Sequence, residues 1–320
     1  MSGQRVQSSF SPPWWLRNPH AQTLWGAMFR GSFDNVLREE RLPTPDGDFL
    51  RLFWSTTPHA PDGPLIVMMH GLAGSVESPY LQGLYQAFAT CQVEAVTFQL
   101  RGSGLVPNAT ARSYHSGSID DFEHVLTTLR GRYPHRPLRS VGVSLSGNLM
   151  LLHLGLRGAD SLLDRAVAIC PPMDLHRCNQ RMSRGVSVLY QQHLLRLLQE
   201  AVGRKRAIVE AAGYDVDAIL ASRSFREFDD RFTAPLHGFR DADHYYTDAS
   251  SQPVLGNVQV PTWILTSEDD PFMYPDITPP ASAVSDAVTL EVADRGGHVG
   301  FVEGFNRYWL DRRVPEILLP

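Results

Sequence analysis

The residue best placed to do chemistry in this sequence is a serine in a glycine-containing turn. The segment Gly142-Val143-Ser144-Leu145-Ser146-Gly147 follows an apolar, strand-like run and precedes the helix-compatible residues 148–154. A sharp turn between a strand and a helix projects a serine hydroxyl clear of the backbone, and small residues at 142, 146 and 147 let the two elements approach closely. We therefore predict that Ser144 is a nucleophile. The alternative is an ordinary strand-to-helix loop with a capping serine.

A serine hydroxyl is a weak nucleophile, so it needs a general base and a carboxylate that orients the base. Two later apolar runs each end in suitable residues. The first leads into Ser267-Glu268-Asp269-Asp270-Pro271, and the second leads into Gly296-Gly297-His298-Val299-Gly300. We predict His298 as the base and Asp270 as the acid, with Asp269 as the competing acid. The alternative is structural, because acidic residues often cap turns and a histidine between glycines often has no catalytic role.

The order of these residues along the chain, serine then acid then histidine, is typical of the α/β-hydrolases. Such chemistry also needs backbone N–H groups that bind the developing oxyanion. The N–H of Leu145, directly after the serine, is one predicted donor. The loop His70-Gly71-Leu72-Ala73-Gly74 follows another apolar run, and we predict the N–H of Leu72 as the second donor. The alternative for this loop is a simple glycine-rich exit from a strand.

The elements that must position these residues are indicated by short apolar runs. Stretches with helical spacing separate most of the runs, which predicts an α/β fold with a mostly parallel twisted sheet and helices on both faces. The turn residues Pro45-Asp46-Gly47 predict an opening hairpin. The apolar runs lie at residues 65–69, 93–98, 140–143, 166–170, 263–266 and 288–292.

The strand signal is absent between Cys170 and Pro261, and helical spacing replaces it. We interpret residues 173–255 as a helical cap inserted into a single α/β-hydrolase domain that spans residues 1–320. The cap is expected to cover the carboxyl edge of the sheet. The clearest helical face has an apolar residue at every fourth position, at Tyr190, Leu194, Leu198 and Val202.

Composition limits the classes of protein to which the chain can belong. Of the 320 residues, 43% are hydrophobic and 20% are charged, which is typical of a globular protein and excludes intrinsic disorder. The net charge of -5 provides no basic field, so we expect no nucleic-acid partner. No run reaches the roughly 18 apolar residues of a spanning helix, so we expect no transmembrane segment.

Lysine and cysteine usage narrows the chemistry further. Lys205 is the only lysine and lies in a charged run, which argues against Schiff-base and P-loop chemistry. Cys91, Cys170 and Cys178 are too few and too unevenly spaced for a disulfide framework or a zinc cluster. We therefore expect a cytoplasmic protein that uses neither a metal ion nor a cofactor.

A set of motifs occurs in order along nearly the whole chain. They are Pro12-Pro13-Trp14-Trp15-Leu16-Arg17-Asn18-Pro19-His20-Ala21-Gln22-Thr23, His70-Gly71-Leu72-Ala73-Gly74-Ser75, Arg101-Gly102-Ser103-Gly104, Tyr114-His115-Ser116-Gly117, Phe228-Asp229, Thr233-Ala234-Pro235-Leu236-His237-Gly238-Phe239 and Asp269-Asp270-Pro271-Phe272. With these motifs the chain resembles the YheT-like branch of the α/β-hydrolases, which is related to the mammalian ABHD1 and ABHD3 type. The resemblance implies an α/β-hydrolase core, a serine triad and carboxylic ester hydrolase activity, and the related mammalian branch acts on lipids. The branch commonly has glycine where this chain has Ser146.

Other groups of polar and aromatic residues receive structural interpretations. His115 and Asp120 have a spacing found at some acyltransferase sites, but we favour a turn that leads into a helix. The histidines and aspartates within residues 237–244 have no recognised metal-ligand spacing. One interpretation of the N-terminal aromatic residues is contact with a membrane surface, but we favour packing over the core for Trp14, Trp15 and Trp25.

These observations predict a serine hydrolase that cleaves carboxylic esters of small molecules through an acyl-enzyme on Ser144. The apolar face of the cap favours acyl or lipid-like substrates. Two alternatives stay open. One is an acyltransferase that uses the same three residues, and the other is a non-catalytic binding module built on the hydrolase fold.

Overall fold

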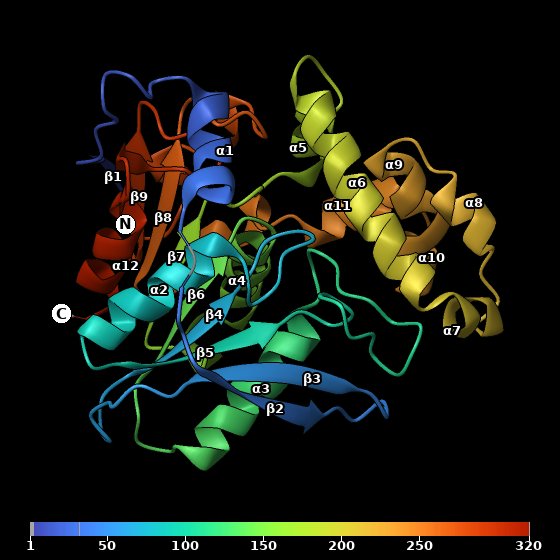
Figure 1. Ribbon diagram of the computed structural model, residues 1–320, viewed down its shortest axis with the longest axis horizontal. Coiled ribbons are helices and arrows are strands. Elements are labelled where there is room, and N and C mark those ends of the chain that lie inside the picture. The colour runs from blue at the N-terminus through green and yellow to red at the C-terminus, as the bar shows by residue number, and fades with distance from the viewer. Residues whose placement is uncertain (1–2, 32, 320) are drawn as a thin grey trace.

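The structure, a computed structural model, describes residues 3–31 and 33–319 and is built around one large sheet. The strands of this sheet are β1 (Gln4–Gln7), β2 (Leu37–Pro43), β3 (Phe49–Ser55), β4 (Leu65–Met69), β5 (Glu94–Gln99), β6 (Leu138–Val143), β7 (Arg165–Ile169), β8 (Thr262–Ser267) and β9 (Val288–Ala293). Their spatial order is β1-β9-β8-β7-β6-β4-β5-β3-β2 (Figure 1). In this spatial order, every pair of neighbouring strands between β1 at one edge and β5 is parallel. The last two strands pair antiparallel, β3 with β5 and β2 with β3. The predicted α/β fold with a mostly parallel sheet is confirmed.

The central strands are visible in the sequence because both of their faces are covered. Every residue of β4 and β5 is buried, and β4 consists only of leucine, isoleucine, valine and methionine. A strand that is buried on both sides cannot alternate polar and apolar residues, so it appears as a continuous apolar run. Each of the six predicted runs overlaps a strand of the sheet.

The sequence pattern predicted the strands at one edge of the sheet and missed the strand at the other edge. The predicted hairpin is confirmed, because β2 and β3 pair in antiparallel register on either side of a turn that contains Gly47 with a φ of 80°. At the other edge β1 pairs in parallel with β9. Its sequence, Gln-Arg-Val-Gln, is mostly polar and exposed, so periodicity did not predict it.

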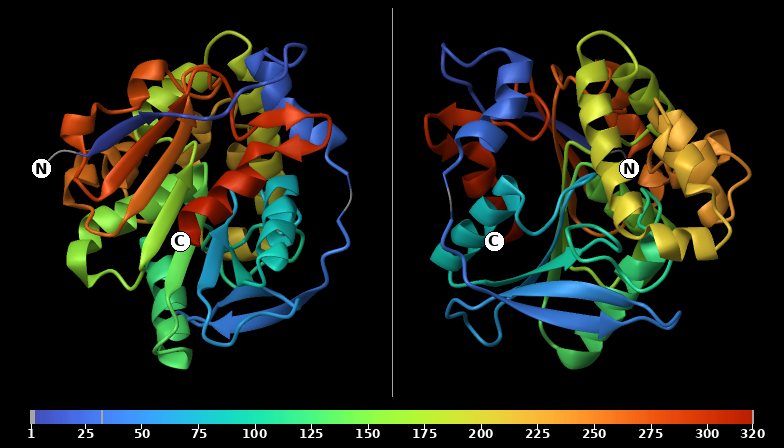
Figure 2. Two further views of the ribbon diagram at one scale, coloured as in Figure 1. Left: turned by 90° about the vertical axis from the view of Figure 1, so that its left-hand side faces the viewer. Right: turned by 45° about the vertical axis from the view of Figure 1, so that its right-hand side comes forward.

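Helices cover both faces of the sheet. They include α1 (Pro19–Phe29), α2 (Pro79–Thr90), α3 (Ile119–Arg132), α4 (Leu145–Arg157) and α12 (Trp309–Leu318), with short 3-10 segments η1 (Gly158–Asp160), η4 (Pro275–Ile277) and η5 (Ala281–Ala283). Helices α2 and α12 pack together on one face, and α3 and α4 pack together on the other (Figures 1 and 2). A small hairpin of β10 (Val302–Gly304) and β11 (Arg307–Tyr308) precedes α12.

The chain between β7 and β8 is helical throughout its described elements. These elements are α5 (Leu175–Met182), α6 (Ser187–Arg204), α7 (Arg206–Ala211), α8 (Val216–Leu220), α9 (Phe225–Phe228), the π-helical η2 (Asp229–Thr233), α10 (Ala234–Leu236), α11 (Ala242–Ala249) and the 3-10 segment η3 (Gln252–Asn257). Several of them share a small hydrophobic core of their own, which includes Leu195, Val202, Val209, Phe228 and Phe232. Figure 1 shows this helical segment beside the sheet and joined to it.

The N-terminal aromatic residues pack over the core only in part. Leu16 is buried with Val302 and Tyr308, and Trp25 packs against this cluster. Trp14 and Trp15, by contrast, are 82% and 41% exposed, so the expectation that these two side chains pack over the core is wrong. The side chain of Leu16 occupies the buried position, and Trp14 is left facing solvent.

Cys91, Cys170 and Cys178 are all free thiols. No helix among the described residues is long and apolar enough to cross a bilayer. The expected cytoplasmic location stays a prediction.

The contact between α4 and η3 gives a test of the packing. A Cβ added at Gly155 would lie 2.5 Å from the carbonyl oxygen of Val254, so Gly155→Ala must displace backbone. We expect this variant to lower the free energy of unfolding by about 1–3 kcal/mol in urea denaturation. Gly131→Ala in α3 is the control, because a Cβ there meets nothing within 4 Å. The control should be neutral or stabilising by up to about 1 kcal/mol, and equal destabilisation of both variants would contradict the packing.

Candidate active site

Ser144 lies in a strained turn between β6 and α4. Its φ is 53° and its ψ is -118°, and its N–H donates to the carbonyl oxygen of Ile169 at 2.7 Å. A positive φ at a residue other than glycine costs energy and is held only by its surroundings. Gly142 is needed here, because a Cβ on it would lie 2.5 Å from the carbonyl oxygen of Ser146. The turn therefore holds the Ser144 hydroxyl at the carboxyl end of the sheet.

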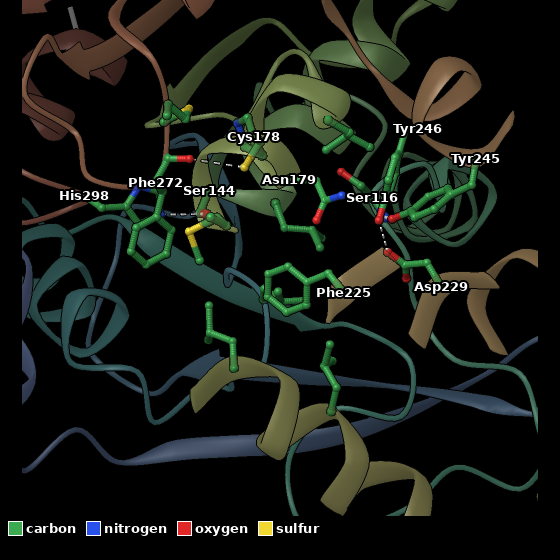
Figure 3. Close-up of a pocket in the computed structure, with 18 residues that line it drawn as sticks. Ser116, Ser144, Cys178, Asn179, Phe225, Asp229, Tyr245, Tyr246, Phe272 and His298 are labelled. Atoms are coloured by element: carbon green, nitrogen blue, oxygen red, sulfur yellow. Dashed lines mark hydrogen bonds between the residues drawn. The ribbon is translucent and has the colours of Figure 1, made fainter. Parts of the chain in front are cut away.

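The structure brings the serine, the histidine and one of the two aspartates into a continuous chain of hydrogen bonds. The Nε2 atom of His298 lies 2.9 Å from the Oγ atom of Ser144 (Figure 3). Its Nδ1 atom lies 2.8 Å from the Oδ2 atom of Asp270. A carboxylate only accepts hydrogen bonds, so Nδ1 carries the ring proton and Nε2 is free to accept from the hydroxyl. His298 and Asp270 are both buried.

The two neighbouring aspartates have different partners. Asp270 accepts from the imidazole through Oδ2 and from the N–H of Phe272 through Oδ1 at 2.8 Å. Asp269 instead accepts from the N–H of Gly297 at 2.9 Å, and burial raises the pKa of its carboxyl group. Asp269 thus holds the loop that carries His298, whereas Asp270 contacts the imidazole directly.

Residues that the sequence interpretation did not single out hold His298 in place. The ring of Phe272 stacks on the imidazole with 4.0 Å between centroids and 10° between planes. The hydroxyl of Thr23, on α1, accepts from the backbone N–H of His298 at 2.9 Å and donates to the carbonyl oxygen of Pro19. Both residues lie inside the quoted motifs, so the resemblance was the signal that pointed to them.

The buried side chain of Gln22 anchors the same loop to α1. It donates to the carbonyl oxygens of Leu16 and Val302 and accepts from the N–H of Val302. A Cβ at Gly300 would lie 2.5 Å from the carbonyl oxygen of Gln22, so the loop and the helix are in direct backbone contact. Helix α1 is therefore part of the support of the site.

The loop after β4, which begins at His70, carries Leu72. The N–H groups on either side of it are already bound, Gly71 to the Tyr80 hydroxyl at 2.9 Å and Ala73 to the Tyr114 hydroxyl at 2.7 Å. Leu72 lines a cavity together with Ser144 and His298. Leu145, the other predicted donor, is the first residue of α4 and lines that cavity as well. The structure thus places Leu72 and Leu145 in the wall of the cavity that contains Ser144, and the role of their N–H groups stays a prediction.

His70 and Ser146 fix this loop. The Nε2 atom of His70 accepts from the N–H of Leu100 at 3.2 Å, so its protonated Nδ1 donates to the carbonyl oxygen of Gly71 at 2.8 Å. Burial lowers the pKa of His70 to about 4. The hydroxyl of Ser146 donates to the carbonyl oxygen of His70 at 2.5 Å. Ser146, at a position where the resemblance leads us to expect glycine, is therefore accommodated, and it ties the turn of Ser144 to the loop of Leu72.

Two cavities meet at Ser144. The first, which we name the cap cavity, lies between Ser144 and the helices that follow β7 (Figure 3). The second, which we name the α1 cavity, lies between α1 and α6 and also reaches Ser144 and His298. The walls of the cap cavity are mainly apolar and include Leu175, Met182, Leu194, Leu198 and Phe225. The walls of the α1 cavity include Thr23, Gly26, Ala27, Arg30, Tyr80 and Tyr308.

One carboxyl group stands out in the wall of the cap cavity. Burial raises the pKa of Asp229 to about 6, although the Tyr246 hydroxyl donates to it at 2.7 Å (Figure 3). Asp229 belongs to the quoted Phe228-Asp229 motif, but neither spacing nor periodicity singled it out.

The two other polar groups that the sequence suggested are engaged in contacts within the fold. The rings of His115 and His237 are in contact, with 4.2 Å between centroids and 50° between planes, while Asp120 forms an ion pair with Arg112. Asp241 accepts from a backbone N–H at the start of α11. These contacts agree with the structural interpretation of both groups.

A metal ion does not fit the one dense group of possible ligands beside the serine. Ligand atoms of Cys170, Asp270 and His298 lie within 4.8 Å of one another. Burial raises the pKa of the Cys170 thiol, whereas a metal needs the thiolate. Both ring nitrogens of His298 are already engaged with Ser144 and Asp270.

Comparison with known proteins identifies relatives across almost the full chain. A family model described as the alpha/beta hydrolase fold matches residues 64–305. YheT of Escherichia coli is 36% identical over 97% of this chain and 93% of its own length. Phospholipase ABHD3 of Homo sapiens is 29% identical over 93% of this chain and 75% of its own length. The solved structure of an esterase from Pyrococcus furiosus has a TM-score of 0.58 over 99% of this chain and 98% of that chain, with 14% identity, and so supports the fold alone.

The raised pKa of Asp229 predicts a dependence of stability on pH. The folded state binds this proton more tightly than the unfolded state, so the contribution of Asp229 to stability falls as pH rises from about 4 to about 6. The variant Asp229→Asn has no carboxyl group to ionise at this position, so it does not lose stability in this way as pH rises. Relative to wild type, the variant should gain up to about 3 kcal/mol in free energy of unfolding across that range, measured by urea denaturation at each pH.

A second variant checks the cause of this effect. Tyr246→Phe removes a hydrogen bond that stabilises the carboxylate, so the pH range of the loss should move upward. A difference between Asp229→Asn and wild type that does not change with pH would contradict the raised pKa.

Proposed function

The chain belongs to the α/β-hydrolase family, and we propose that it is a serine esterase that cleaves carboxylic esters through an acyl-enzyme on Ser144. The observation that carries this proposal is the pair of hydrogen bonds that links Ser144 to His298 and His298 to Asp270. The name of the human relative, a phospholipase, supports an ester as the substrate class.

The proposed first half of the reaction forms the acyl-enzyme. The Oγ atom of Ser144 attacks the ester carbonyl carbon while Nε2 of His298 takes the hydroxyl proton. The carboxylate of Asp270 stabilises the resulting imidazolium through Nδ1. When the tetrahedral intermediate collapses, the bond to the alcohol oxygen breaks and His298 gives its proton to that oxygen. The alcohol leaves, and the acyl group stays on Ser144.

The second half returns the enzyme to its starting state. Nε2 of His298 takes a proton from water as the water oxygen attacks the acyl carbonyl carbon. The second tetrahedral intermediate collapses, His298 returns the proton to Oγ of Ser144, and the carboxylic acid is released. In both halves the N–H groups of Leu72 and Leu145 bind the oxyanion. The hydroxyls of Tyr80 and Tyr114, which hold the neighbouring N–H groups, support this role by fixing the loop before reaction.

The two cavities suit the two parts of an ester. We assign the acyl chain to the cap cavity, because its walls are mainly apolar and it opens on Ser144. The alcohol part is then left to the α1 cavity, which has polar side chains such as Arg30 and Tyr80 in its walls. In this proposal the helices within residues 173–255 act as the cap that covers the acyl chain.

Substitution of the three proposed catalytic residues tests the mechanism. Ser144→Ala should abolish hydrolysis of p-nitrophenyl esters and covalent labelling by a fluorophosphonate probe. Asp270→Asn should lower kcat by about 10⁴-fold, because the histidine loses the carboxylate that holds its tautomer and stabilises the imidazolium.

Asp269→Asn is the matched control. An amide oxygen at this position can still accept from the N–H of Gly297, so kcat should stay within about tenfold of wild type. Labelling that persists in Ser144→Ala, or a greater loss in Asp269→Asn than in Asp270→Asn, would overturn the assignment. Absence of labelling in the wild type would favour the non-catalytic binding module.

The acyl assignment predicts a dependence on chain length. For p-nitrophenyl esters of increasing length, kcat/KM should rise by about fourfold per methylene group until the cap cavity is filled, since each buried methylene contributes about 0.8 kcal/mol. Initial rates below the micelle concentration of each ester provide the measurement. A strict preference for highly charged acyl groups would contradict an apolar acyl site.

A further inference from the structure

The outer face of α1 is unusually apolar for a surface helix. Leu24, Met28 and Phe29 are exposed on it, and exposed Trp14 and Trp15 precede it in the chain. The exposed side chain of Phe305 extends the same surface, because its ring contacts that of Trp25 with 5.8 Å between centroids. Contiguous exposed apolar side chains of this kind mark an interaction site.

The surface continues across the α1 cavity to the start of α6. Val186 and Leu189 are exposed there, and α1 and α6 touch where Nδ1 of His20 lies 3.1 Å from the Tyr190 hydroxyl. Figures 1 and 2 show α1 and the N-terminal end of α6 at the same end of the molecule. We name the exposed apolar side chains on both sides of the cavity the apolar rim, which comprises Trp14, Trp15, Leu24, Met28, Phe29, Val186, Leu189 and Phe305.

The α1 cavity lies between α1 and α6, the two helices that carry residues of the apolar rim. Gly26 and Ala27 of α1 and Leu194 of α6 line the α1 cavity, which reaches Ser144.

Basic side chains without ion-pair partners lie beside the apolar rim, and the two nearby carboxylates are already engaged, Asp294 with Gln7 and Glu303 with Arg312. The chain has a net charge of -5, yet its first acidic residue is Asp34, so the whole segment up to α1 and through it lacks carboxylates. Arg17 lies in this segment, and Arg295 reaches it by donating to the carbonyl oxygen of Arg17 at 3.0 Å. Arg307 follows Phe305 in the hairpin. Within residues 3–31 and 33–319, none of these three arginines forms an ion pair.

We propose that the apolar rim docks on an anionic lipid surface, from which ester substrates enter the α1 cavity. Tryptophan and phenylalanine insert favourably at the boundary between head groups and acyl chains, and unpaired arginines attract anionic head groups. The entry of substrate rests on the proposed esterase function, but the docking itself does not.

Vesicle binding tests the docking independently of catalysis. The full chain carrying Ser144→Ala is sedimented with large unilamellar vesicles of phosphatidylcholine with and without phosphatidylglycerol. We expect binding to the vesicles that contain phosphatidylglycerol, weaker binding without it, and a decrease as salt concentration rises.

The rim variant combines Trp14→Ser, Met28→Gln and Leu189→Gln, at positions that are 82%, 66% and 66% exposed. The partition constant for vesicles should fall at least about tenfold, because each of these side chains loses its burial in lipid. The matched control combines Val36→Gln, Leu105→Gln and Leu156→Gln, which are 72%, 83% and 56% exposed but lie outside the apolar rim. The control should bind vesicles like the parent protein.

Several outcomes would overturn the proposal. They are no vesicle binding by the parent protein, equal binding by the rim and control variants, and binding that does not depend on phosphatidylglycerol. Size-exclusion chromatography adds another. If the parent protein is a dimer that the rim variant alone dissociates, and vesicles do not bind, the apolar rim is a contact between two copies of this chain.

Activity on a soluble short-chain ester separates this proposal from the proposed function. The same rim substitutions, made with Ser144 intact, should leave hydrolysis of p-nitrophenyl acetate unchanged and slow the hydrolysis of esters held in anionic vesicles. If the acetate is not hydrolysed by the wild type while vesicles still bind, the esterase proposal fails and the docking proposal stands.

Discussion

The site depends on one constraint, that the His298 imidazole stays within hydrogen-bond distance of a serine and a carboxylate at once. Those two residues follow different strands of the sheet, and the imidazole comes from a third loop. Hydrogen bonds weaken steeply when distance or angle drifts, so the ring must be held from several sides. Phe272 packs on its face, Thr23 binds its backbone, and Asp269 binds the preceding residue.

This requirement makes α1 part of the site although it lies far from the serine in sequence. The inner side of the helix holds the histidine loop through Gln22 and Thr23, and it also lines the α1 cavity. Its outer side carries exposed apolar residues. One short helix therefore links the position of the imidazole, the wall of a cavity and a surface of the molecule. On the other side of the serine, the helices after β7 supply apolar walls of the cap cavity.

The sequence predicted much of this arrangement because buried parallel strands appear as apolar runs and because the chemical residues follow such runs. Ser144, Asp270 and His298 could be proposed from their types and order alone. Thr23 and Phe272 could not, since neither has a spacing or chemistry that suggests contact with a histidine. The prediction that Trp14 packs over the core was wrong. Composition favours burial of tryptophan, and only the path of the chain shows that Leu16 takes the buried position.

What the sequence determined by itself was the fold class, the hairpin at the sheet edge and the short set of residues able to perform acyl chemistry. Only the tertiary structure decided which of the two adjacent aspartates faces the imidazole. It also decided which N–H of the loop after β4 lies between two N–H groups that already have partners. Finally, only the structure shows that two cavities meet at the serine. The reason is physical. Periodicity and residue type report whether a segment is buried and what it can do, whereas distances of a few ångströms between loops arise from the order of strands and the packing of helices across the sheet.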